Sequence, residues 1–358
     1  MTAGAPLDPC GEIPAPPWLA ALPKADLHVH QEERARLDRI VSSQEGRAPY
    51  DWRGRARRLR AETPAGFGRL EGIYAPDAAL PTVGLAGDSP EEVVAKIADV
   101  LAEGAADGAL LVEIRFGGWI VERPDWMALF REAERRAQAR YPRLRAEAIG
   151  YLGLDADPAR LAAGERQLAA CLRAAREGLG GVDFRVDPYD TEADPALWAV
   201  ARRWVARAAD AGLGVTVHAG EFSTANLAAA LQMPGLRRLG HAVYAAADER
   251  LLDRLADSGA TVECCPTCNV ILGSVPSFEV HPLRRFMARG IPVTLNTDLP
   301  VHTATTIGRE YAVAAALGCS PADLLGFTRN AVAAAFTTAE RRAALLAELR
   351  AAEDTLPA

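Results

Sequence analysis

The stretch that decides the fold is Val215-Thr216-Val217-His218-Ala219-Gly220-Glu221. Its run of β-branched residues predicts a buried parallel strand. The strand ends on His218 and Glu221, and the small residues Ala219 and Gly220 let the backbone turn sharply between them. A histidine at a strand end can bind a metal ion, and a glutamate beside it can transfer protons. The same pattern also fits a core histidine followed by a glutamate that opens a helix.

Strand and helix patterns alternate along the rest of the chain. Besides 214–218, strands are expected at 25–30, 109–116, 144–154, 182–186, 238–241, 261–265 and 292–296. Helical sequence follows each strand, and three more helices are expected after Pro300, at 304–318, 321–333 and 338–351. Eight strands that alternate with helices predict one (β/α)8 TIM barrel of the α/β class, with extra C-terminal helices. An open doubly wound sheet is the alternative, but it would need a glycine-rich phosphate turn after an early strand, which the sequence lacks.

The chain is expected to consist of a short lead-in and one barrel domain. Residues 1–17 are rich in proline and predict a loose lead-in. Residues 18–358 are expected to form the barrel, with a long helical excursion from 31 to 108 after the first strand. The excursion closes on a helix at Pro90–Glu103, which Ser89 would cap.

The composition argues against several classes of function. The formal net charge of the 358 residues is −7, which disfavours a dedicated nucleic-acid surface. No apolar run reaches the ~18 residues of a membrane span, and the N-terminus lacks the basic and apolar regions of a secretion signal. Six cysteines in a chain of this length fit reduced thiols better than a secreted disulfide framework. We therefore expect a cytoplasmic protein that acts on a small molecule.

Four of the expected strand ends carry groups that can bind a metal or titrate. These groups are His28 and His30 on the first strand, His218 on the fifth, His241 on the sixth and Asp298 on the eighth. The carboxyl ends of barrel strands meet at one mouth, and side chains two residues apart on a strand point to the same side. Three histidines and a carboxylate form a nitrogen and oxygen set suited to a catalytic zinc ion with a position left for water. The sequence therefore predicts a zinc site.

Six blocks of the sequence match a known family in order and spacing. They are Pro23–His30, Val112–Arg115, Thr216–Glu221, Leu239–His241, Glu263–Val270 and Thr294–Asp298. On these blocks the sequence resembles the adenosine deaminase branch of the amidohydrolase superfamily. With flanking sequence the resemblance extends from residue 23 to about residue 311, nearly the whole chain.

The resemblance implies one zinc ion per chain and a proton-transfer site beside it. The zinc ligands would be His28, His30, His218 and Asp298. The catalytic residues would be Glu221, which protonates the ring nitrogen next to the attacked carbon, His241, which orients and deprotonates the zinc-bound water, and Asp298. Zinc lowers the pKa of a bound water to roughly 7, so hydroxide is available at neutral pH. Its attack on an amine-bearing ring carbon would release ammonia.

One departure from the family lies beside the expected metal site. Leu299 follows Asp298 where the family has a second aspartate, which bonds a nitrogen of the purine's five-membered ring. A leucine would leave that nitrogen unpaired, at a cost of about 1–3 kcal/mol. Plain adenosine is therefore expected to be a poor substrate.

Other departures affect the expected substrate contacts. Glu32 and Glu33 stand where the family has an aspartate that touches the sugar and then a glycine. Val186 stands where a glycine amide approaches the purine, and Asp187 follows it. The substrate-binding residues are therefore expected to be Glu32, Val186, Asp187, Gly220 and Leu299.

Charge patterns outside the expected metal site predict one ion pair and one charged helix face. Glu113 and Arg115, two residues apart on the second strand, are expected to pair inside the barrel. The stretch 34–60 is rich in arginine, and such a run is usually a solvated helix face. Because the corresponding excursion covers the active site in the family, contact with an anionic group of the substrate stays open.

The sequence therefore predicts a zinc-dependent hydrolytic deaminase of an adenosine-like nucleoside or a modified amino-heterocycle. One alternative is hydrolysis of another cyclic C–N bond by the same zinc hydroxide. A second alternative is a ligand-binding protein without turnover, against which the complete set of metal-binding and proton-transfer residues argues.

Overall fold

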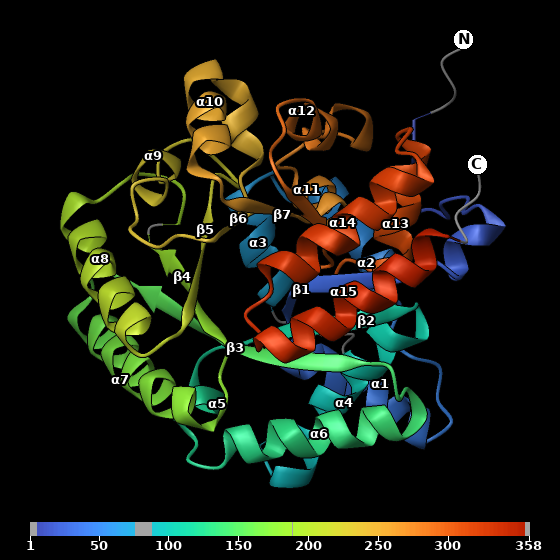
Figure 1. Cartoon of the computed structure of the whole chain (residues 1–358), viewed down its shortest axis with the longest axis horizontal. Helices are drawn as coiled ribbons and strands as arrows, with labels where there is room; N and C mark the ends of the chain where they lie inside the picture. Colours follow the sequence, from blue (N-terminus) through green and yellow to red (C-terminus); the bar gives the residue numbers. More distant parts are fainter. Residues whose placement is uncertain (1–5, 76–87, 188, 355–358) are drawn as a thin grey trace.

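Eight parallel strands, hydrogen-bonded in sequence order, form the centre of the molecule (Figure 1). The computed structural model describes residues 6–75, 88–187 and 189–354. The strands are β1 (Lys24–His30), β2 (Ala109–Phe116), β3 (Arg145–Leu154), β4 (Gly181–Val186), β5 (Gly214–Ala219), β6 (Arg238–His241), β7 (Thr261–Cys264) and β8 (Val293–Leu295). Their bounds agree with the sequence prediction to within one residue at each end.

The segment after β8 closes the sheet into a barrel. Asp298 pairs with Val29 in a parallel bridge. Its N–H donates to the carbonyl of His28 at 2.6 Å, and its carbonyl accepts from the N–H of His30 at 2.8 Å. The prediction of a (β/α)8 barrel is confirmed.

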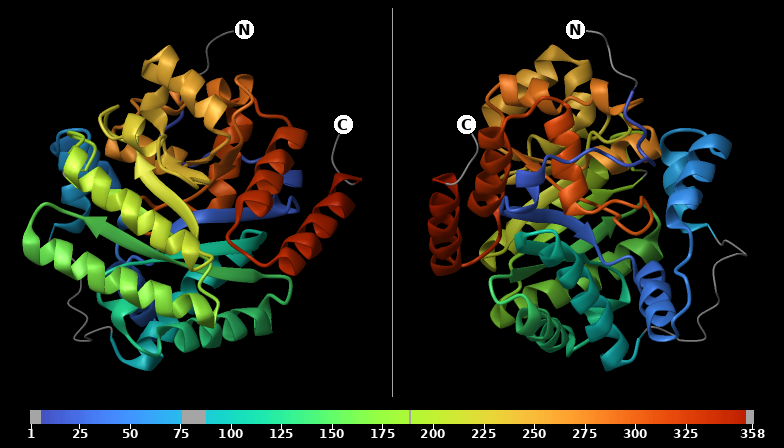
Figure 2. Two further views of the ribbon diagram at one scale, coloured as in Figure 1. Left: turned by 60° about the vertical axis from the view of Figure 1, so that its left-hand side comes forward. Right: turned by 90° about the vertical axis from the view of Figure 1, so that its right-hand side faces the viewer.

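Helices surround the strands on the outside (Figures 1 and 2). They are α1 (Glu33–Gln44), α2 (Trp52–Glu62), α3 (Phe67–Tyr74), α4 (Pro90–Ala106), α5 (Trp119–Glu122), α6 (Trp126–Arg140), α7 (Pro158–Ala174), α8 (Pro195–Asp210), α9 (Leu227–Ala230), α10 (Glu249–Ser258), α11 (Pro266–Leu272), α12 (Leu283–Ala288), α13 (Ile307–Ala316), α14 (Pro321–Ala334) and α15 (Ala339–Glu353). The long excursion after β1 forms α1 to α4, and α15 packs on α14 as an extra C-terminal helix. Within the described ranges, no helix is long and apolar enough to cross a membrane.

Four of these helices begin with the same sequence signal. A capping residue and a proline open α4 (Ser89-Pro90), α7 (Asp157-Pro158), α8 (Asp194-Pro195) and α14 (Ser320-Pro321). The capping side chain accepts hydrogen bonds from free N–H groups of the first turn, and proline at that point loses no helical hydrogen bond. Helix starts of this kind can therefore be located from sequence alone.

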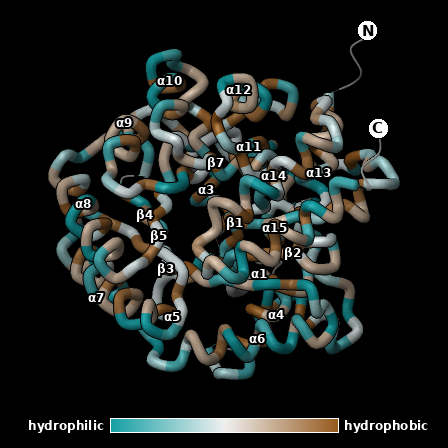
Figure 3. Tube along the Cα trace, viewed as in Figure 1, coloured by the Kyte–Doolittle hydropathy of each residue, from teal (hydrophilic) through white to brown (hydrophobic). Residues whose placement is uncertain are grey.

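The helices present apolar sides to the barrel and polar sides to solvent. In α8, the inward side consists of Leu197, Trp198, Ala201, Trp204, Val205 and Ala208, all buried. Hydrophilic and hydrophobic residues alternate along the outer helices in Figure 3, as expected for helices that cover a core on one side only.

The barrel interior holds buried charges in addition to apolar side chains. Arg238 pairs with Glu113, and its guanidinium carbon lies 3.8 Å from the centre of the Phe336 ring. Arg115 instead contacts Asp183 and Glu263. The expected pairing of Glu113 with Arg115 is therefore wrong. Both residues point inward, but each finds its partner on another strand: Glu113 contacts Arg238 of β6, and Arg115 contacts carboxylates of β4 and β7.

Phe336 fills the space under the amino ends of β4 and β5. A methyl group added to Gly214 would lie 2.1 Å from the Cδ1 atom of this ring, and one added to Gly181 would lie 2.3 Å from Cδ2. Both distances are far below van der Waals contact. The two glycines therefore create the space that the ring occupies.

We predict that Gly214→Ala lowers the free energy of unfolding by about 1–3 kcal/mol, because the packed ring has to shift. Gly326→Ala is the matched control, since nothing lies within 4 Å of its added methyl group and alanine favours the helix there. Denaturant unfolding of both variants measures the difference. Equal stability of the two variants would contradict this packing.

Candidate metal centre and active-site cavity

Four of the predicted site residues meet at the carboxyl mouth of the barrel. His28 and His30 come from β1, His218 from β5, and Asp298 from the segment after β8. The His28 Nε2 atom lies 3.1 Å from His218 Nε2, and Asp298 Oδ1 lies 3.3 Å from His30 Nε2 and 3.5 Å from His28 Nε2. One potential donor atom from each residue lies within 4.8 Å of the others. The structure thus brings together the whole predicted ligand set.

Carboxylates behind the cluster orient two of the imidazoles. His28 Nδ1 lies 2.7 Å from Glu263 Oε2, and His218 Nδ1 lies 3.0 Å from Asp183 Oδ1. A carboxylate accepts the Nδ1 hydrogen, which leaves the Nε2 lone pair free to face the cluster. Arg115 contacts both carboxylates.

Burial keeps the histidines of the cluster neutral. Desolvation lowers the pKa of His28, His30 and His218 well below the ordinary value of histidine, and the charge of Arg115 lowers all three pKa values further. A neutral imidazole is the form that binds a metal ion. Three such imidazoles and a carboxylate fit a divalent metal that accepts nitrogen and oxygen ligands.

Strained backbone lies at the same mouth. His241 has a φ of 64° and Asp298 a φ of 60°, both in the left-handed region that costs a non-glycine residue roughly 1–3 kcal/mol. Asp298 is held there by its two backbone hydrogen bonds to β1. The strain aims its carboxylate at the histidines, as is common at functional sites.

Glu221 is buried beside the cluster with one oxygen paired and one free. Its Oε2 atom accepts a hydrogen bond from the Tyr189 hydroxyl at 2.8 Å, whereas Oε1 is buried and has no partner among the described residues. Burial raises the pKa of Glu221 well above its ordinary value, and the nearby charge of Asp298 raises it further. A neutral carboxyl therefore carries its proton on Oε1.

The loop that carries Glu221 is fixed by Asp190. The Asp190 carboxylate accepts hydrogen bonds from the N–H groups of Gly220, Phe222 and Ser223 at 3.2, 2.7 and 3.3 Å. Sequence reasoning did not assign Tyr189 to the site, because an aromatic residue in a loop carries no spacing signal. Tyr189 reaches Glu221 because the loop after β4 contacts the loop after β5.

A chain of hydrogen bonds determines which nitrogen of His241 carries the proton. The Leu283 N–H donates to His281 Nδ1 at 3.1 Å, so the hydrogen of neutral His281 is on Nε2. That Nε2 lies 3.3 Å from Asn269 Oδ1, and Asn269 Nδ2 lies 3.2 Å from His241 Nδ1. Because Asn269 donates to Nδ1, the hydrogen of neutral His241 must be on Nε2.

The Nε2 atom of His241 lies near the carboxyl groups of Glu221 and Asp298. Nε2 lies 3.6 Å from Glu221 Oε2 and 4.0 Å from Asp298 Oδ2. Desolvation lowers the pKa of His241, and also that of His281 to about 3, so both rings are neutral. His241 is therefore a hydrogen-bond donor toward the cluster.

These groups open into a cavity of about 240 Å³ at the mouth of the barrel. The residues that line it are His30, Leu70, Tyr74, Tyr151, Arg185, Tyr189, His218, Glu221, His241, Asp298 and Leu299. Leu299 lines the cavity, as predicted for a residue that contacts the substrate. Its side chain packs with α11, a helix that begins directly after Cys265 and that the sequence did not predict.

The other four predicted substrate contacts are not among the lining residues that the structure describes. Glu32 accepts hydrogen bonds from the N–H groups of Val301 and His302 and contacts Arg36. Val186 is buried in the core, and Asp187 pairs with Arg185. Gly220 has a φ of 72° and lies against Ala242, which explains a glycine there without a ligand. Their contact with a substrate stays a prediction. The side chain of Glu33 lies outside the described residues.

Arginines of the stretch 34–60 mainly hold the excursion in place. Arg36 and Arg39 both contact Asp99 and Glu103 on α4. Arg55 donates to backbone carbonyls between 72 and 75. These contacts favour a structural role over the binding of an anionic group.

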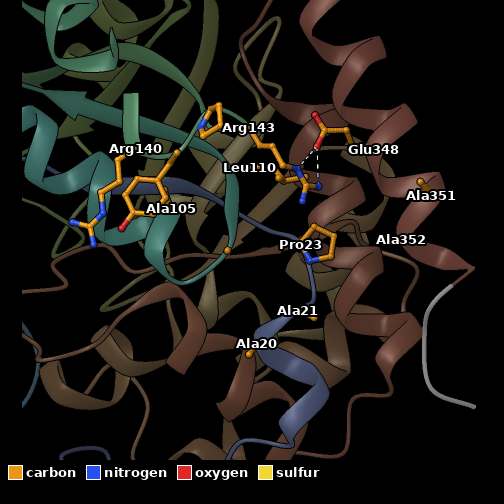
Figure 4. A pocket seen from close by; sticks show the side chains of 13 residues that line it. Ala20, Ala21, Pro23, Ala105, Leu110, Arg140, Arg143, Glu348, Ala351 and Ala352 are labelled. Carbon is orange, nitrogen blue, oxygen red and sulfur yellow. Dashed lines mark hydrogen bonds and ion pairs between the residues drawn. The ribbon is translucent and has the colours of Figure 1, made fainter. Parts of the chain in front are cut away.

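A second hollow, of about 660 Å³, lies at the other end of the barrel (Figure 4). It is lined by residues that precede or begin the first three strands, such as Pro23, Leu110 and Pro142, and the ion pair of Arg143 with Glu348 crosses it at 2.9 Å. None of the candidate metal ligands lies there. Among the described residues, the candidate metal ligands therefore lie at the carboxyl mouth, where barrels of this kind have their active sites.

The chain is a parallel barrel with three histidines and a carboxylate, which could hold a metal ion, at its carboxyl mouth. The sequence profile of the adenosine deaminase family matches residues 165–352. The chain belongs to the adenosine deaminase family, which confirms the resemblance found in the sequence.

Similar proteins are known as sequences and as structures. The chain is 47% identical over 144 residues to an adenine deaminase of Rhizobium leguminosarum bv. trifolii and 44% identical over 145 residues to one of Chelativorans sp.. Each alignment covers 40% of this chain and 45% of the relative, so the chain matches less than half the length of these relatives.

Solved structures are similar over nearly the whole chain. Arabidopsis ADAL complexed with IMP has a TM-score of 0.73 at 19% identity and covers 95% of this chain and 99% of its own. A zinc-bound amidohydrolase of Burkhoderia ambifaria has a TM-score of 0.67 at 21% identity, with coverage of 94% and 93%. At this level of identity, the similarity supports the fold alone.

The hydrogen-bond chain yields a prediction for His241. In ¹⁵N NMR spectra of histidine-labelled protein, we expect the hydrogen of neutral His241 on Nε2. Asn269→Asp replaces the donor by a carboxylate, which should draw a hydrogen onto His241 Nδ1. Asn330→Asp is the control, since Asn330 donates only to the carbonyl of Val293. A wild-type His241 with its hydrogen on Nδ1 would refute the assigned chain.

Proposed function

We propose that this chain is a zinc-dependent hydrolase that removes the amine of an adenine-like heterocycle and releases ammonia. The observation that carries the proposal is buried Glu221, which lines the cavity with three of the four candidate metal ligands and whose Oε1 atom has no partner among the described residues. The relatives named adenine deaminases support this class of substrate.

The donor set supports zinc as the metal. His28, His30 and His218 offer neutral imidazole nitrogens and Asp298 offers a carboxylate, a combination typical of catalytic zinc sites. The zinc-bound structural neighbour supports the same choice. When bound, zinc would supply an activated water molecule at neutral pH.

Glu221 would deliver the proton that the ring requires. Attack on the amine-bearing carbon moves an electron pair onto the adjacent ring nitrogen, which must then be protonated. Tyr189 donates to Oε2 of Glu221, so Oε1 would be the oxygen that carries the proton and delivers it. The group would act in its neutral form, and activity should fall as the pH rises through the pKa of Glu221.

His241 would orient the attacking oxygen by donating from Nε2. The hydrogen on Nε2 supports one of the two roles that the resemblance implies for His241, namely that it orients the water. A neutral ring with hydrogen on Nε2 cannot also accept a proton there. We therefore assign the removal of a proton from the attacking water to the carboxylate of Asp298, whose Oδ2 lies 4.0 Å from His241 Nε2. Asp298 would thus be both a ligand and a catalytic residue.

The cavity favours a free base over a nucleoside. Its volume of about 240 Å³ lies below the roughly 300–1,000 Å³ of pockets that hold drug-sized ligands. Leu70, Leu299 and the tyrosine rings provide flat apolar walls for an aromatic ring.

Glu221→Gln keeps the shape of the side chain but cannot deliver a proton. We predict that ammonia release falls ~10²-fold or more, while the zinc content stays near one ion per chain. Glu147→Gln is the matched control, because this buried glutamate bonds Thr337 and Arg341 at the opposite end of the barrel and should keep full turnover. Chelator-treated wild type should lose activity and regain it with zinc. Near-normal turnover by Glu221→Gln would exclude Glu221 as the acid.

A further inference from the structure

Arg185 is the cationic side chain among the described residues that line the cavity. It lies on β4 two residues after Asp183, and the two side chains therefore point to the same side of the strand. Asp183 supports His218 behind the cluster. At about 3.3 Å per residue, Arg185 lies roughly 7 Å nearer the mouth. Arg185 lines the same cavity as the candidate metal ligands, so a ring whose reacting carbon lies against those ligands would leave another edge for Arg185.

The guanidinium of Arg185 has hydrogen-bond donors to spare. One terminal nitrogen lies 3.0 Å from Asp187 Oδ2, and the group lies 5.7 Å from the centre of the Tyr189 ring. The Nε atom is buried and has no partner among the described residues. A guanidinium offers five N–H donors. Most of them are not used by the contacts that the structure gives this side chain.

Arg115 and Arg123, two arginines with structural roles, use more of their donors than Arg185 does. Arg36 also has a buried Nε atom without a partner among the described residues, but it does not line the cavity. Arg115 contacts Asp183, Glu263 and the carbonyl of Leu27. Arg123 forms a two-pronged pair with Asp125 and also bonds the carbonyl of Asp88. Against these, the single carboxylate contact of Arg185 and its place in the cavity wall point to a ligand as the missing acceptor.

We propose that Arg185 binds an acceptor oxygen on the substrate, at the ring edge away from the amine-bearing carbon. This inference rests on the proposed deaminase function, because the reacting carbon must lie against Glu221 and the metal ligands. A planar guanidinium can donate hydrogen bonds to the two lone pairs of a ring carbonyl oxygen, which leaves the ring nitrogen beside the amine-bearing carbon free to receive the proton from Glu221. The preferred substrate is then an amino-oxo heterocycle, with adenine itself a poorer one.

The surroundings favour a ring carbonyl over an anionic group. Asp187 balances the positive charge of Arg185, and Leu299 adds an apolar side chain to the cavity lining. A neutral carbonyl oxygen loses little water on entering such a site, whereas a phosphate loses much more. A ring carbonyl and a phosphate both offer oxygen atoms that accept hydrogen bonds from a guanidinium, so the test includes a ligand with each group.

The test compares adenine, 2-oxoadenine and AMP as substrates and as ligands. With the wild type, 2-oxoadenine should exceed adenine in kcat/KM by about 10- to 100-fold, the loss typical of one hydrogen bond to a charged group. Arg185→Met should abolish this preference, and Arg185→Lys should keep part of it, since lysine retains the charge without the planar fork. Arg123→Met breaks a similar Arg–Asp pair outside the cavity and should behave as the wild type. Melting temperatures check that the variants are folded.

Calorimetric binding of the same compounds separates this inference from the proposed function. If no compound releases ammonia but 2-oxoadenine binds in a manner that depends on Arg185, the deaminase proposal fails and the inference stands. An unchanged ratio of 2-oxoadenine to adenine in Arg185→Met, in both turnover and binding, would overturn it. A dependence on Arg185 that is confined to AMP would overturn the choice of a ring carbonyl.

Discussion

The contact of Arg115 with Asp183 and Glu263 is the interaction on which the site depends. These carboxylates, from β4 and β7, hold His218 from β5 and His28 from β1. All of these side chains are buried, and a carboxylate in that position would be costly without a cation beside it. Arg115 thus allows two negative charges to stand behind neutral imidazoles and fixes which nitrogen of each ring faces the mouth. The charge in the barrel interior is part of the metal site.

The same logic of fixed donors extends to the proton-transfer groups. Tyr189 leaves one oxygen of Glu221 free, and Asn269 leaves one hydrogen on His241 facing inward. Tyr189 and Asn269 thus determine which atom of Glu221 and of His241 can carry or donate a proton. The backbone does the same for Asp298, which is held in a strained conformation by its bonds to β1. The site is therefore preorganised by packing, with little freedom left to the reacting groups.

The fold, and the grouping of the four candidate metal ligands, could be predicted from the sequence because both follow local rules. Strand and helix periods located every strand, and residues at strand ends converge in any closed barrel. The position of Arg185, the bond from Tyr189 and the pairing of Glu113 with Arg238 could not be predicted, because they depend on which loops and strands meet in space. For Glu32 the resemblance to the family indicated a substrate contact, and the two backbone N–H groups that its carboxylate accepts from could not be predicted from the sequence.

The central claim is that these supported side chains bind one zinc ion. Anomalous diffraction at the zinc absorption edge, from crystals of protein purified without chelator, tests it most directly. The account predicts one strong peak per chain, placed between His28, His30, His218 and Asp298. An absent peak at this position, or a peak at Cys265 and Cys268 instead, would contradict it.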